Sequence, residues 1–243
     1  LASISLDLDN QWSYMKIHGD AGWDRYPSYF DIFVPHVLDL LDQLDLKITF
    51  FIVGRDAAID ENQEYLRQIT ARGHEVGNHS FHHEPWLHAF TKDRIRREVL
   101  DTEEHILRVT GQTPTGFRAP GFSWSPELIK VLSECGYAYD ASSLPTFLGP
   151  LARAYYFRRS RLDSEAKSQR SLLFGRFSDG FQPLKPFYWQ LASGQTLLEL
   201  PVTTMPMVKM PFHLSYLLYL SRFSLPLMRS YLGIALALCR VTG

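Results

Sequence analysis

Residues 32–54 read IFVPHVLDLLDQLDLKITFFIVG, a stretch in which a helical pattern is followed at once by a strand pattern. Its first part repeats apolar side chains at the spacing of one helix face, which predicts a helix over Ile32–Leu46: Phe33, Val37, Leu40, Leu41 and Leu44. Its second part, Ile48–Val53, is β-branched or aromatic and closes at Gly54, as is typical of a buried strand. A helix therefore feeds a strand here, which is the unit of an α/β fold.

The same order of elements recurs on both sides of this stretch. Apolar and polar residues alternate over Ala2–Leu8, which predicts a first strand. Further helices are expected over Glu61–Arg72, Thr91–Thr110 and Pro126–Glu134. Short extended segments are expected over Glu75–Asn78, Gly116–Ala119, Tyr137–Asp140 and Leu197–Val202. Strands that alternate with helices indicate βαβ units around a parallel sheet or barrel.

The composition excludes several kinds of protein. With 243 residues, 45% of them hydrophobic, the chain can bury a full core, and α/β barrels of this length commonly form one domain. Charged residues make up 21% and the formal net charge is -1, so nothing indicates a nucleic-acid partner. Two distant cysteines, Cys135 and Cys239, give neither a disulfide framework nor a CxxC metal motif. We expect a single domain over residues 1–243.

The regular alternation fails between Leu144 and Gln195, and we expect an insertion over the barrel, or a lid, at about 146–195. Arginines and aromatic residues are interleaved there: Arg153, Arg158, Arg159 and Arg161 with Tyr155, Tyr156, Phe157, Phe187, Tyr188 and Trp189. Aromatic faces suit sugar rings and clustered arginines suit phosphate, which would favour a lipid-linked or phosphorylated sugar. The alternative is a solvated basic loop held down by its aromatic residues.

The two ends of the chain bear on its location. The sequence begins at Leu1 without a secretory pattern, and its start looks trimmed. The apolar segment Phe212–Cys239 is interrupted by Arg222, Pro226 and Arg229, so it is not expected to span a membrane. It could lie on a membrane surface, since leucine and aromatic residues alternate there with a few arginines. A cytoplasmic location, or one peripheral to the membrane, is therefore expected.

Two carboxylates and two imidazoles form the candidate site. Asp7 and Asp9 lie two apart on the first strand, so their side chains leave the same face and require a cation or an arginine nearby. A strand end exposed to water is the alternative. His79 and His83 are four apart, which on a helical turn brings both rings to one face and suits a single zinc-like ion. With one carboxylate they would make a three-ligand site with an open position, as in catalytic zinc centres.

Two further charged residues end predicted strands. Arg118 precedes a Pro-Gly turn, and its guanidinium could hydrogen-bond Asp7 in a fixed orientation; the alternative is a surface arginine. Asp140 ends the next strand, where it is either an outer charge partner of the site or a helix cap.

Five segments, taken in order, resemble the polysaccharide deacetylase family of the NodB type. They are Ser5-Leu6-Asp7-Leu8-Asp9, Thr49-Phe50-Phe51-Ile52-Val53-Gly54, Gly73-His74-Glu75-Val76-Gly77-Asn78-His79-Ser80-Phe81-His82-His83, Arg118-Ala119-Pro120 and Tyr139-Asp140-Ala141-Ser142-Ser143. The resemblance covers residues 3 to about 145. It implies a distorted parallel (β/α) barrel and a divalent metal, zinc being the usual one.

The resemblance also implies a part for each matching residue. Asp9, His79 and His83 become the metal ligands, Asp7 the catalytic base and Arg118 its orienter. Asp140 joins the catalytic group, and Pro120 and Tyr139 are placed at the substrate. The family's general acid is a histidine on a late strand. Here that histidine either follows Gly243 on a last strand that this chain lacks, is replaced by His213, or is absent, in which case the protein is no competent hydrolase.

The expected function is hydrolysis of an N-acetyl or similar acyl group on an amino sugar of a polysaccharide or lipid-linked glycan of the cell envelope. Two alternatives stay open. The same metal and base would serve a deformylase or a cyclic-amide hydrolase, and a non-catalytic sugar-binding module could keep the metal for structure. The expected partner is a carbohydrate, either free or lipid-linked, and no nucleic acid is expected.

Overall fold

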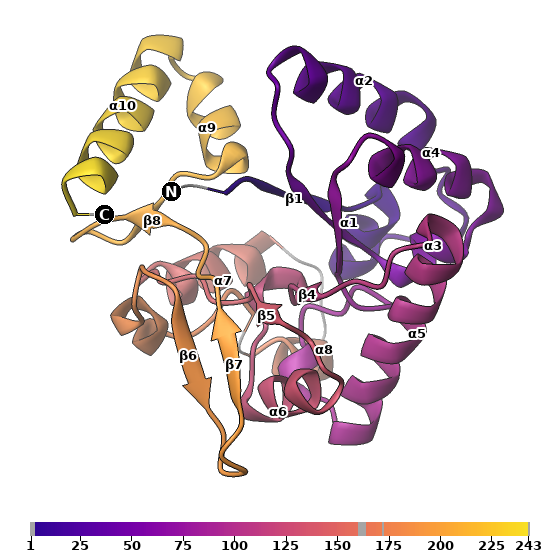
Figure 1. The fold of residues 1–243 in the computed structure, drawn as a ribbon. Helices are drawn as coiled ribbons and strands as arrows, with labels where there is room; N and C mark the ends of the chain where they lie inside the picture. Colours follow the sequence, from indigo (N-terminus) through magenta and orange to yellow (C-terminus); the bar gives the residue numbers. More distant parts are fainter. Residues whose placement is uncertain (1–2, 160–163, 172, 243) are drawn as a thin grey trace.

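The structure is a computed structural model, and it describes residues 3–159, 164–171 and 173–242. Figure 1 shows a central sheet with helices packed around it. The sheet has the strand order β1-β2-β3-β4-β5-β7-β6. Its strands are β1 (Ser5–Leu8), β2 (Thr49–Ile52), β3 (Glu75–Asn78), β4 (Gly116–Phe117), β5 (Tyr139–Asp140), β7 (Thr196–Glu199) and β6 (Phe187–Gln190).

All neighbours from β1 to β7 pair in parallel, and β6 alone runs antiparallel, against β7. The parallel α/β architecture predicted from the sequence is confirmed. Within the described residues, β1 has a strand partner on one side only, so the distorted barrel is open beside it.

Four long helices carry the core. They are α2 (Phe30–Gln43), α4 (Asp60–Ala71), α5 (Lys92–Thr110) and α6 (Pro126–Glu134), and each lies where the sequence predicts a helix. Side chains of α2, α4 and the start of the sheet form one buried cluster, which includes Phe30, Leu38, Phe50 and Leu66. Side chains of α5, α6 and the later strands form a second, which includes Val99, Phe117 and Leu132. These two clusters fix the strands whose ends carry the candidate site.

Two helices near the site have no counterpart in the sequence prediction, namely α1 (Gln11–His18) and α3 (Gly54–Ala58). Only Trp12 and Ser13 of α1 are buried, so α1 lacks the apolar stripe by which a helix is recognised in a sequence. The short helix α3 begins at Gly54, directly after the strand β2.

Regular elements also occur in residues 146–195, for which the sequence indicates none. They are α7 (Gly149–Arg159), α8 (Ser164–Gln169), the 3-10 helix η4 (Phe177–Phe181) and β6, which joins the main sheet as an edge strand. Arg153 donates from Nη1 to the carbonyls of Leu173 and Gly175, so it ties this segment together. Arg161 and the side chain of Arg159 lie outside the described residues. That the segment is an insertion or a lid stays a prediction.

The C-terminal part forms a small hairpin and two helices beside β1 (Figure 1). The hairpin pairs β8 (Thr204–Met205) with β9 (Met210–Pro211), and the helices are α9 (Leu214–Ser221) and α10 (Leu225–Thr242). The two helices are separate, since α9 ends at Ser221 and Pro226 lies in the first turn of α10. In the part of the chain that is described, no helix has both the length and the apolarity to cross a bilayer.

Candidate active site

The candidate residues lie at the carboxyl ends of neighbouring parallel strands. Asp9 follows the end of β1, His79 and His83 follow β3, and Arg118 follows β4. Carboxyl ends of parallel strands meet at one edge of the sheet, where α/β proteins place their ligand sites. The topology therefore brings together residues that are far apart in the sequence.

Asp9, His79 and His83 form a group that fits one small cation. Oδ1 of Asp9 lies 3.5 Å from Nε2 of His79 and 3.2 Å from Nε2 of His83. Ligand atoms about 2.0–2.1 Å from a tetrahedral zinc ion are separated by about 3.4 Å, which matches both distances. Oδ1 of Asp9 and Nδ1 of His83 are buried without a hydrogen-bond partner, and Asp9 Oδ1 has no donor to satisfy it other than a cation or a protonated imidazole. No other group of His, Cys, Asp or Glu in the described ranges has this geometry.

The tautomer of His79 is set by the main chain. Its Nδ1 lies 2.7 Å from the carbonyl oxygen of Arg118, and a carbonyl can only accept, so Nδ1 carries the proton. The lone pair of Nε2 is then left to face Asp9. This is the arrangement in which metal-binding histidines are usually held.

The loop that carries the two histidines is not a helical turn, and the sequence prediction on this point is wrong. Residues 79–83 have no helical structure, and Ser80 and His83 adopt left-handed backbone angles, with φ of 60° and 53°. Backbone hydrogen bonds from Gly54 to Ser80 and from Arg55 to Phe81 hold the loop from one side. The two imidazoles meet because of this folded loop, with ring centroids 5.1 Å apart.

A buried glutamate holds the same loop from the other side. One carboxylate oxygen of Glu98, on α5, accepts the backbone N–H groups of Phe81 and His82 at 2.9 Å each. The other lies 2.8 Å from Nδ1 of His82. His82 is therefore a supporting residue, directed away from the metal group and toward α5.

Asp7 and Arg118 form the second half of the site. Nη1 of Arg118 donates to Oδ1 of Asp7 at 2.7 Å, and its Nε donates to the carbonyl of Ala141 at 3.1 Å. The guanidinium also lies over the ring of Phe51, 4.3 Å from the centroid. Three contacts fix the guanidinium, so the predicted pairing with Asp7 is present and its direction is set. Arg118 is buried, in contrast to the alternative of a surface arginine.

Electrostatics in the site follow from burial and close charges. Burial would raise the pKa of Asp9, but attraction to His83 and a hydrogen bond with it hold the pKa well below its ordinary value. Burial lowers the pKa of His79. Nearby Asp56 is fully buried, and burial raises its pKa to about 6 although Asn10 and Trp12 both donate to its Oδ1. Of Asp9 and Asp56, Asp9 is thus the one that stays ionised more readily.

Three residues around the metal group escaped the sequence prediction. Tyr14 of α1 lies 3.3 Å from Oδ2 of Asp9, so its hydroxyl can donate to the oxygen that the histidines leave free. Trp12 packs edge-on against His83, with ring centroids 6.5 Å apart. Asp56 anchors Trp12 from the start of α3. The sequence does show aromatic residues directly after Asp9 and Asn10, which could have indicated that they lie near Asp9. The helix could not be recognised, because α1 has no repeat of apolar residues.

Asp140 belongs to a buried acid pair. It caps no helix, because the chain runs from β5 into a loop, and Oδ1 accepts the hydroxyl of Ser142 at 2.6 Å. Its neighbour Glu199 ends β7 and accepts from the indole of Trp189 at 2.7 Å and the backbone N–H of Ser143 at 2.9 Å. Burial, and then repulsion from Asp140, raise the pKa of Glu199 to about 10, so Glu199 is protonated at neutral pH. Its proton satisfies the Asp140 oxygen that otherwise has no partner.

This acid pair reaches the catalytic group through Ser142. The hydroxyl of Ser142 accepts the backbone N–H of Ala119, the residue after Arg118. Asp140 therefore positions the strand end that carries Arg118 and does not touch Asp7 in the contacts of the described residues.

That Tyr139 and Pro120 contact the substrate stays a prediction, and the structure gives only their surroundings. The hydroxyl of Tyr139 donates to Glu75 at 3.0 Å, at the first residue of β3, whereas the metal ligands follow the last residue of that strand. Pro120 is buried at the start of the 3-10 helix η3 (Pro120–Phe122). The structure does not bring either side chain to the metal group.

His213 lies at the N-cap of α9, and the charges of Asp7 and Arg118 act on it. Burial is the largest influence and lowers its pKa, while the charge of Asp7 acts in the opposite direction. Whether His213 replaces the general acid stays a prediction.

Comparisons with known proteins show which family this chain is similar to. The family model described as polysaccharide deacetylase matches residues 20–139. A peptidoglycan deacetylase of Helicobacter pylori is 32% identical over 176 residues, which are 71% of this chain and 57% of that protein. A peptidoglycan-N-acetylglucosamine deacetylase of Bacillus cereus is 35% identical over 88 residues, which are 36% of this chain and 31% of that protein.

One solved structure supports the fold. A protein of Mycobacterium smegmatis described as a polysaccharide deacetylase superposes with a TM-score of 0.59 at 23% identity, covering 83% of this chain and 58% of that one. The chain spans between about a third and three fifths of the length of these three proteins. Family model, curated relatives and fold agree, and the chain belongs to the polysaccharide deacetylase family.

Proposed function

We propose that the protein uses a divalent metal ion, most readily zinc, to hydrolyse the N-acetyl or a similar acyl group of an amino sugar in a glycan. The observation that carries the proposal is the metal group of Asp9, His79 and His83 beside a carboxylate, Asp7, that an arginine holds in place. The two relatives named above are described as deacetylases of peptidoglycan, which supports the choice of substrate class.

The residues divide the chemistry between them. Asp9, His79 and His83 would hold a divalent ion, which would supply Lewis acidity to the amide carbonyl and to the attacking water. Asp7 accepts the proton of that water, since its second oxygen is free of the bond to Arg118. As the C–N bond breaks, the leaving amine takes up a proton, which gives the free amino sugar and the carboxylate of the acyl group. Arg118 fixes the direction of this carboxylate, and Tyr14 steadies the free oxygen of Asp9.

Two aspartate variants separate metal binding from base catalysis. Asp9→Asn removes a ligand and is expected to lose both bound metal and acetate release from N-acetylglucosamine oligomers. Asp7→Asn is expected to keep the metal, measured by elemental analysis, and to lose acetate release by about 100-fold or more. Asp20→Asn, on an exposed residue, is the control and is expected to change neither.

The same assay distinguishes the alternative functions. A sugar-binding module would bind the oligomers without releasing acetate, and a deformylase or cyclic-amide hydrolase would turn over N-formyl or ureide substrates in preference. Acetate release that survives complete removal of metal would contradict the proposed chemistry.

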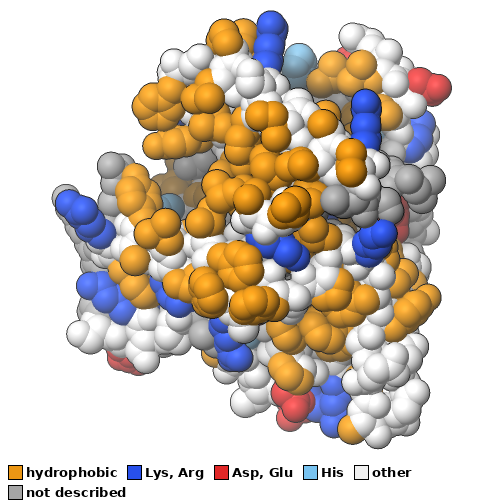
Figure 2. All heavy atoms as spheres, turned by 90° about the vertical axis from the view of Figure 1, so that its left-hand side faces the viewer, with side chains coloured by type: hydrophobic (Ala, Val, Ile, Leu, Met, Phe, Trp, Pro, Cys, Tyr) orange, Lys and Arg blue, Asp and Glu red, His pale blue; other side chains and the backbone are white. Residues whose placement is uncertain are grey.

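A surface near the site supports a lipid-linked substrate. After Glu199 the sequence contains no Asp or Glu, but it contains Lys209, Arg222, Arg229 and Arg240. Large apolar side chains of the α9–α10 region are exposed among these cations: Leu214, Leu218, Tyr219, Phe223, Leu227 and Ile234. Figure 2 shows hydrophobic side chains gathered over this face of the molecule, with Lys and Arg between them.

Exposed aliphatic and aromatic groups that alternate with cations match the chemistry of an anionic bilayer surface. We propose that this face, defined by α9 and α10, binds the surface of an anionic membrane peripherally. A sugar carried on a membrane lipid would then reach the metal group without leaving the membrane.

Binding to vesicles tests this surface. The protein is expected to sediment with phosphatidylcholine vesicles that contain phosphatidylglycerol, and to be released by high salt. The double variant Tyr219→Ser/Phe223→Ser is expected to bind at least 10-fold more weakly. Ile32→Ser is the control, because Ile32 is exposed on α2, remote in sequence from this face. Unchanged binding in the double variant would show that α9 and α10 do not contact the bilayer.

A further inference from the structure

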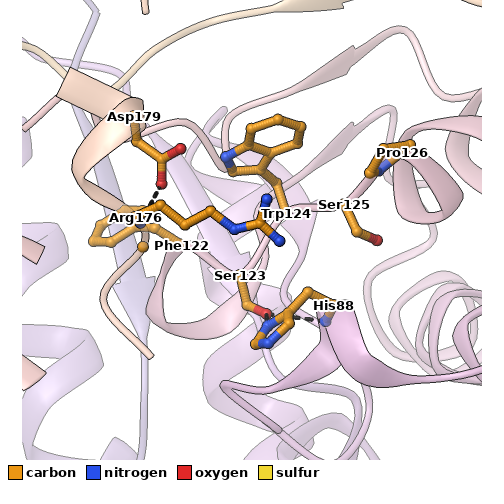
Figure 3. Close-up of a pocket in the computed structure, with 9 residues that line it drawn as sticks. His88, Phe122, Ser123, Trp124, Ser125, Pro126, Arg176 and Asp179 are labelled. Carbon is orange, nitrogen blue, oxygen red and sulfur yellow. Dashed lines mark hydrogen bonds between the residues drawn. The ribbon is translucent and has the colours of Figure 1, made fainter. Parts of the chain in front are cut away.

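A cavity of about 100 Å³ opens between the loops that continue from the catalytic residues. It is lined by His88 from one loop, Phe122–Pro126 from a second, and Gly175, Arg176 and Asp179 from a third. Figure 3 shows these side chains around a common space. No step of the proposed hydrolysis uses any of them.

Arg176 gives the cavity a positive charge. Its guanidinium has no carboxylate partner among the ion pairs of the described residues. Figure 3 shows the side chain extending toward Trp124, Ser123 and His88. The one carboxylate of the lining, Asp179, accepts the backbone N–H of Arg176 at 2.7 Å and so lies at the other end of this residue. The planar donors of the guanidinium are therefore available to an oxyanion.

His88 and Ser123 add a neutral donor. The hydroxyl oxygen of Ser123 accepts the backbone N–H of His88 at 3.0 Å and lies 2.5 Å from its Nδ1. Burial and the charge of Arg176 lower the pKa of His88, which favours the neutral ring. In the tautomer whose Nδ1 accepts the serine proton, the N–H on Nε2 is a hydrogen-bond donor. The hydroxyl of Ser125 is left free to donate because its oxygen accepts from Leu128.

A rigid aromatic wall completes the cavity. The indole of Trp124 packs against that of Trp189, with centroids 4.7 Å apart, and Trp189 is itself fixed by its hydrogen bond to Glu199. An indole held on one side offers its other face to a sugar ring, and an adjacent guanidinium recognises a charge on that sugar.

Two of the loops that line the cavity follow catalytic residues closely along the chain. His88 is five residues after the ligand His83, and Ser123 is five residues after Arg118. The two loops pack directly together, since a Cβ at Gly121 would lie 3.0 Å from the Cβ of Pro85. This packing holds the cavity at a fixed position relative to the two loops that carry His83 and Arg118, which is what a subsite for a neighbouring part of the same glycan requires.

We propose that this cavity is a subsite that binds an oxyanion, a carboxylate or a phosphate, carried by a sugar next to the one that is deacylated. The proposal rests on the proposed function for the position of the neighbouring sugar, but the binding chemistry belongs to Arg176, His88, Ser125 and Trp124. It assigns the substrate class: a glycan with an anionic group beside the N-acetyl sugar.

The test compares three oligosaccharides of equal length: neutral N-acetylglucosamine, one with a lactyl carboxylate on the neighbouring sugar, and one with a phosphomonoester there. Arg176→Gln is expected to raise KM at least 10-fold for one of the anionic oligosaccharides, with kcat and the neutral substrate unchanged. The substrate that responds identifies carboxylate or phosphate. Arg108→Gln, on an exposed arginine of α5, is the matched control.

Equilibrium binding separates this proposal from the proposed function. Calorimetric titration with the same three oligosaccharides is expected to show weaker binding of the anionic one to Arg176→Gln, whether or not acetate is released. If binding depends on Arg176 and no acetate appears, the subsite stands and the proposed function fails. If Arg176→Gln binds all three as the unsubstituted protein does, or loses all three equally, the oxyanion subsite is overturned.

Discussion

Arg118 donates from Nη1 to Oδ1 of Asp7 at 2.7 Å, while its own backbone carbonyl accepts the Nδ1 proton of His79 at the same distance. One residue therefore directs the base with its side chain and sets the tautomer of a metal ligand with its main chain. A substitution at this position removes the first contact and leaves the second in place.

Arg118→Lys is expected to lower kcat for acetate release by roughly 10- to 100-fold. A lysine ammonium is a single point charge and cannot hold Asp7 and the carbonyl of Ala141 in the fixed geometry of a guanidinium. Bound metal, measured by elemental analysis, is expected to stay unchanged. Arg72→Lys, a surface substitution, serves as the control. A kcat equal to that of the unsubstituted protein would mean that Asp7 needs no orienting partner.

Gly54→Ala is expected to weaken metal binding and to lower the free energy of unfolding by about 1–3 kcal/mol. A Cβ there would lie 2.6 Å from both Phe81 Cδ2 and Thr102 Oγ1, and Gly54 supplies the N–H that holds Ser80 in the ligand loop. Metal titration and urea unfolding measure the two effects.

Gly233→Ala is the matched control for this substitution. Gly233 lies in α10 with nothing within 4 Å of the added methyl group, so the change is expected to stabilise by about 0.5–1 kcal/mol and to leave metal binding alone. Equal metal affinity in both variants would contradict the link between Gly54 and the ligand loop.

Stability is expected to fall as the pH rises from neutral toward 10, because of Glu199. Its folded pKa of about 10 lies above the ordinary value of 4.5, so the folded protein keeps a proton that the unfolded chain releases. The stabilisation is complete below pH 4.5 and declines as the pH rises through the folded pKa, by on the order of 1 kcal/mol per pH unit. Urea unfolding at several pH values measures this slope.

Glu199→Gln is expected to flatten that slope, since a neutral amide replaces the protonated acid beside Asp140 without titrating. If the slope persisted in Glu199→Gln, another group would be responsible for it. Glu165→Gln, on the exposed helix α8, is the control and is expected to keep the slope.

Removal of metal by a chelator is expected to lower Tm as well as to abolish acetate release. An ion that binds only the folded state at about 100 times its Kd adds about 2.7 kcal/mol of stability. Calorimetry with and without chelator measures the shift. In Asp9→Asn the chelator is expected to leave Tm unchanged, whereas in Asp7→Asn it is expected to lower Tm as in the unsubstituted protein. An equal decrease of Tm in both variants would show that the stabilisation does not come from an ion bound to Asp9.

The long elements of the fold could be predicted because their burial is visible in local apolar patterns. Helices α2, α5 and α6 each bury one face, and the sequence repeats apolar residues at that spacing. Helix α1 buries only Trp12 and Ser13, and β6 is an edge strand without a buried residue. Neither element therefore has the repeat of buried apolar residues from which a helix or strand is predicted.

The candidate site could be predicted in its residue types and in part of its geometry. Asp9, His79, His83, Asp7 and Arg118 come together as expected. The shape of the ligand loop could not be predicted, because Gly54 holds left-handed Ser80 and Glu98 holds Phe81, and both come from other parts of the sequence. The buried acid Glu199 meets Ser143 across 56 positions for the same reason, with no local signal.

The hydrogen bond between Asp7 and Arg118 joins residues 111 positions apart, on the first and fourth strands of the sheet. Neither side of the catalytic group is formed until β1 to β4 have assembled in order, and such long-range pairing is slow compared with helix formation. During refolding, helical circular dichroism should recover first and activity should lag behind it. The recovery of activity would then report when the strands β1 to β4 have paired.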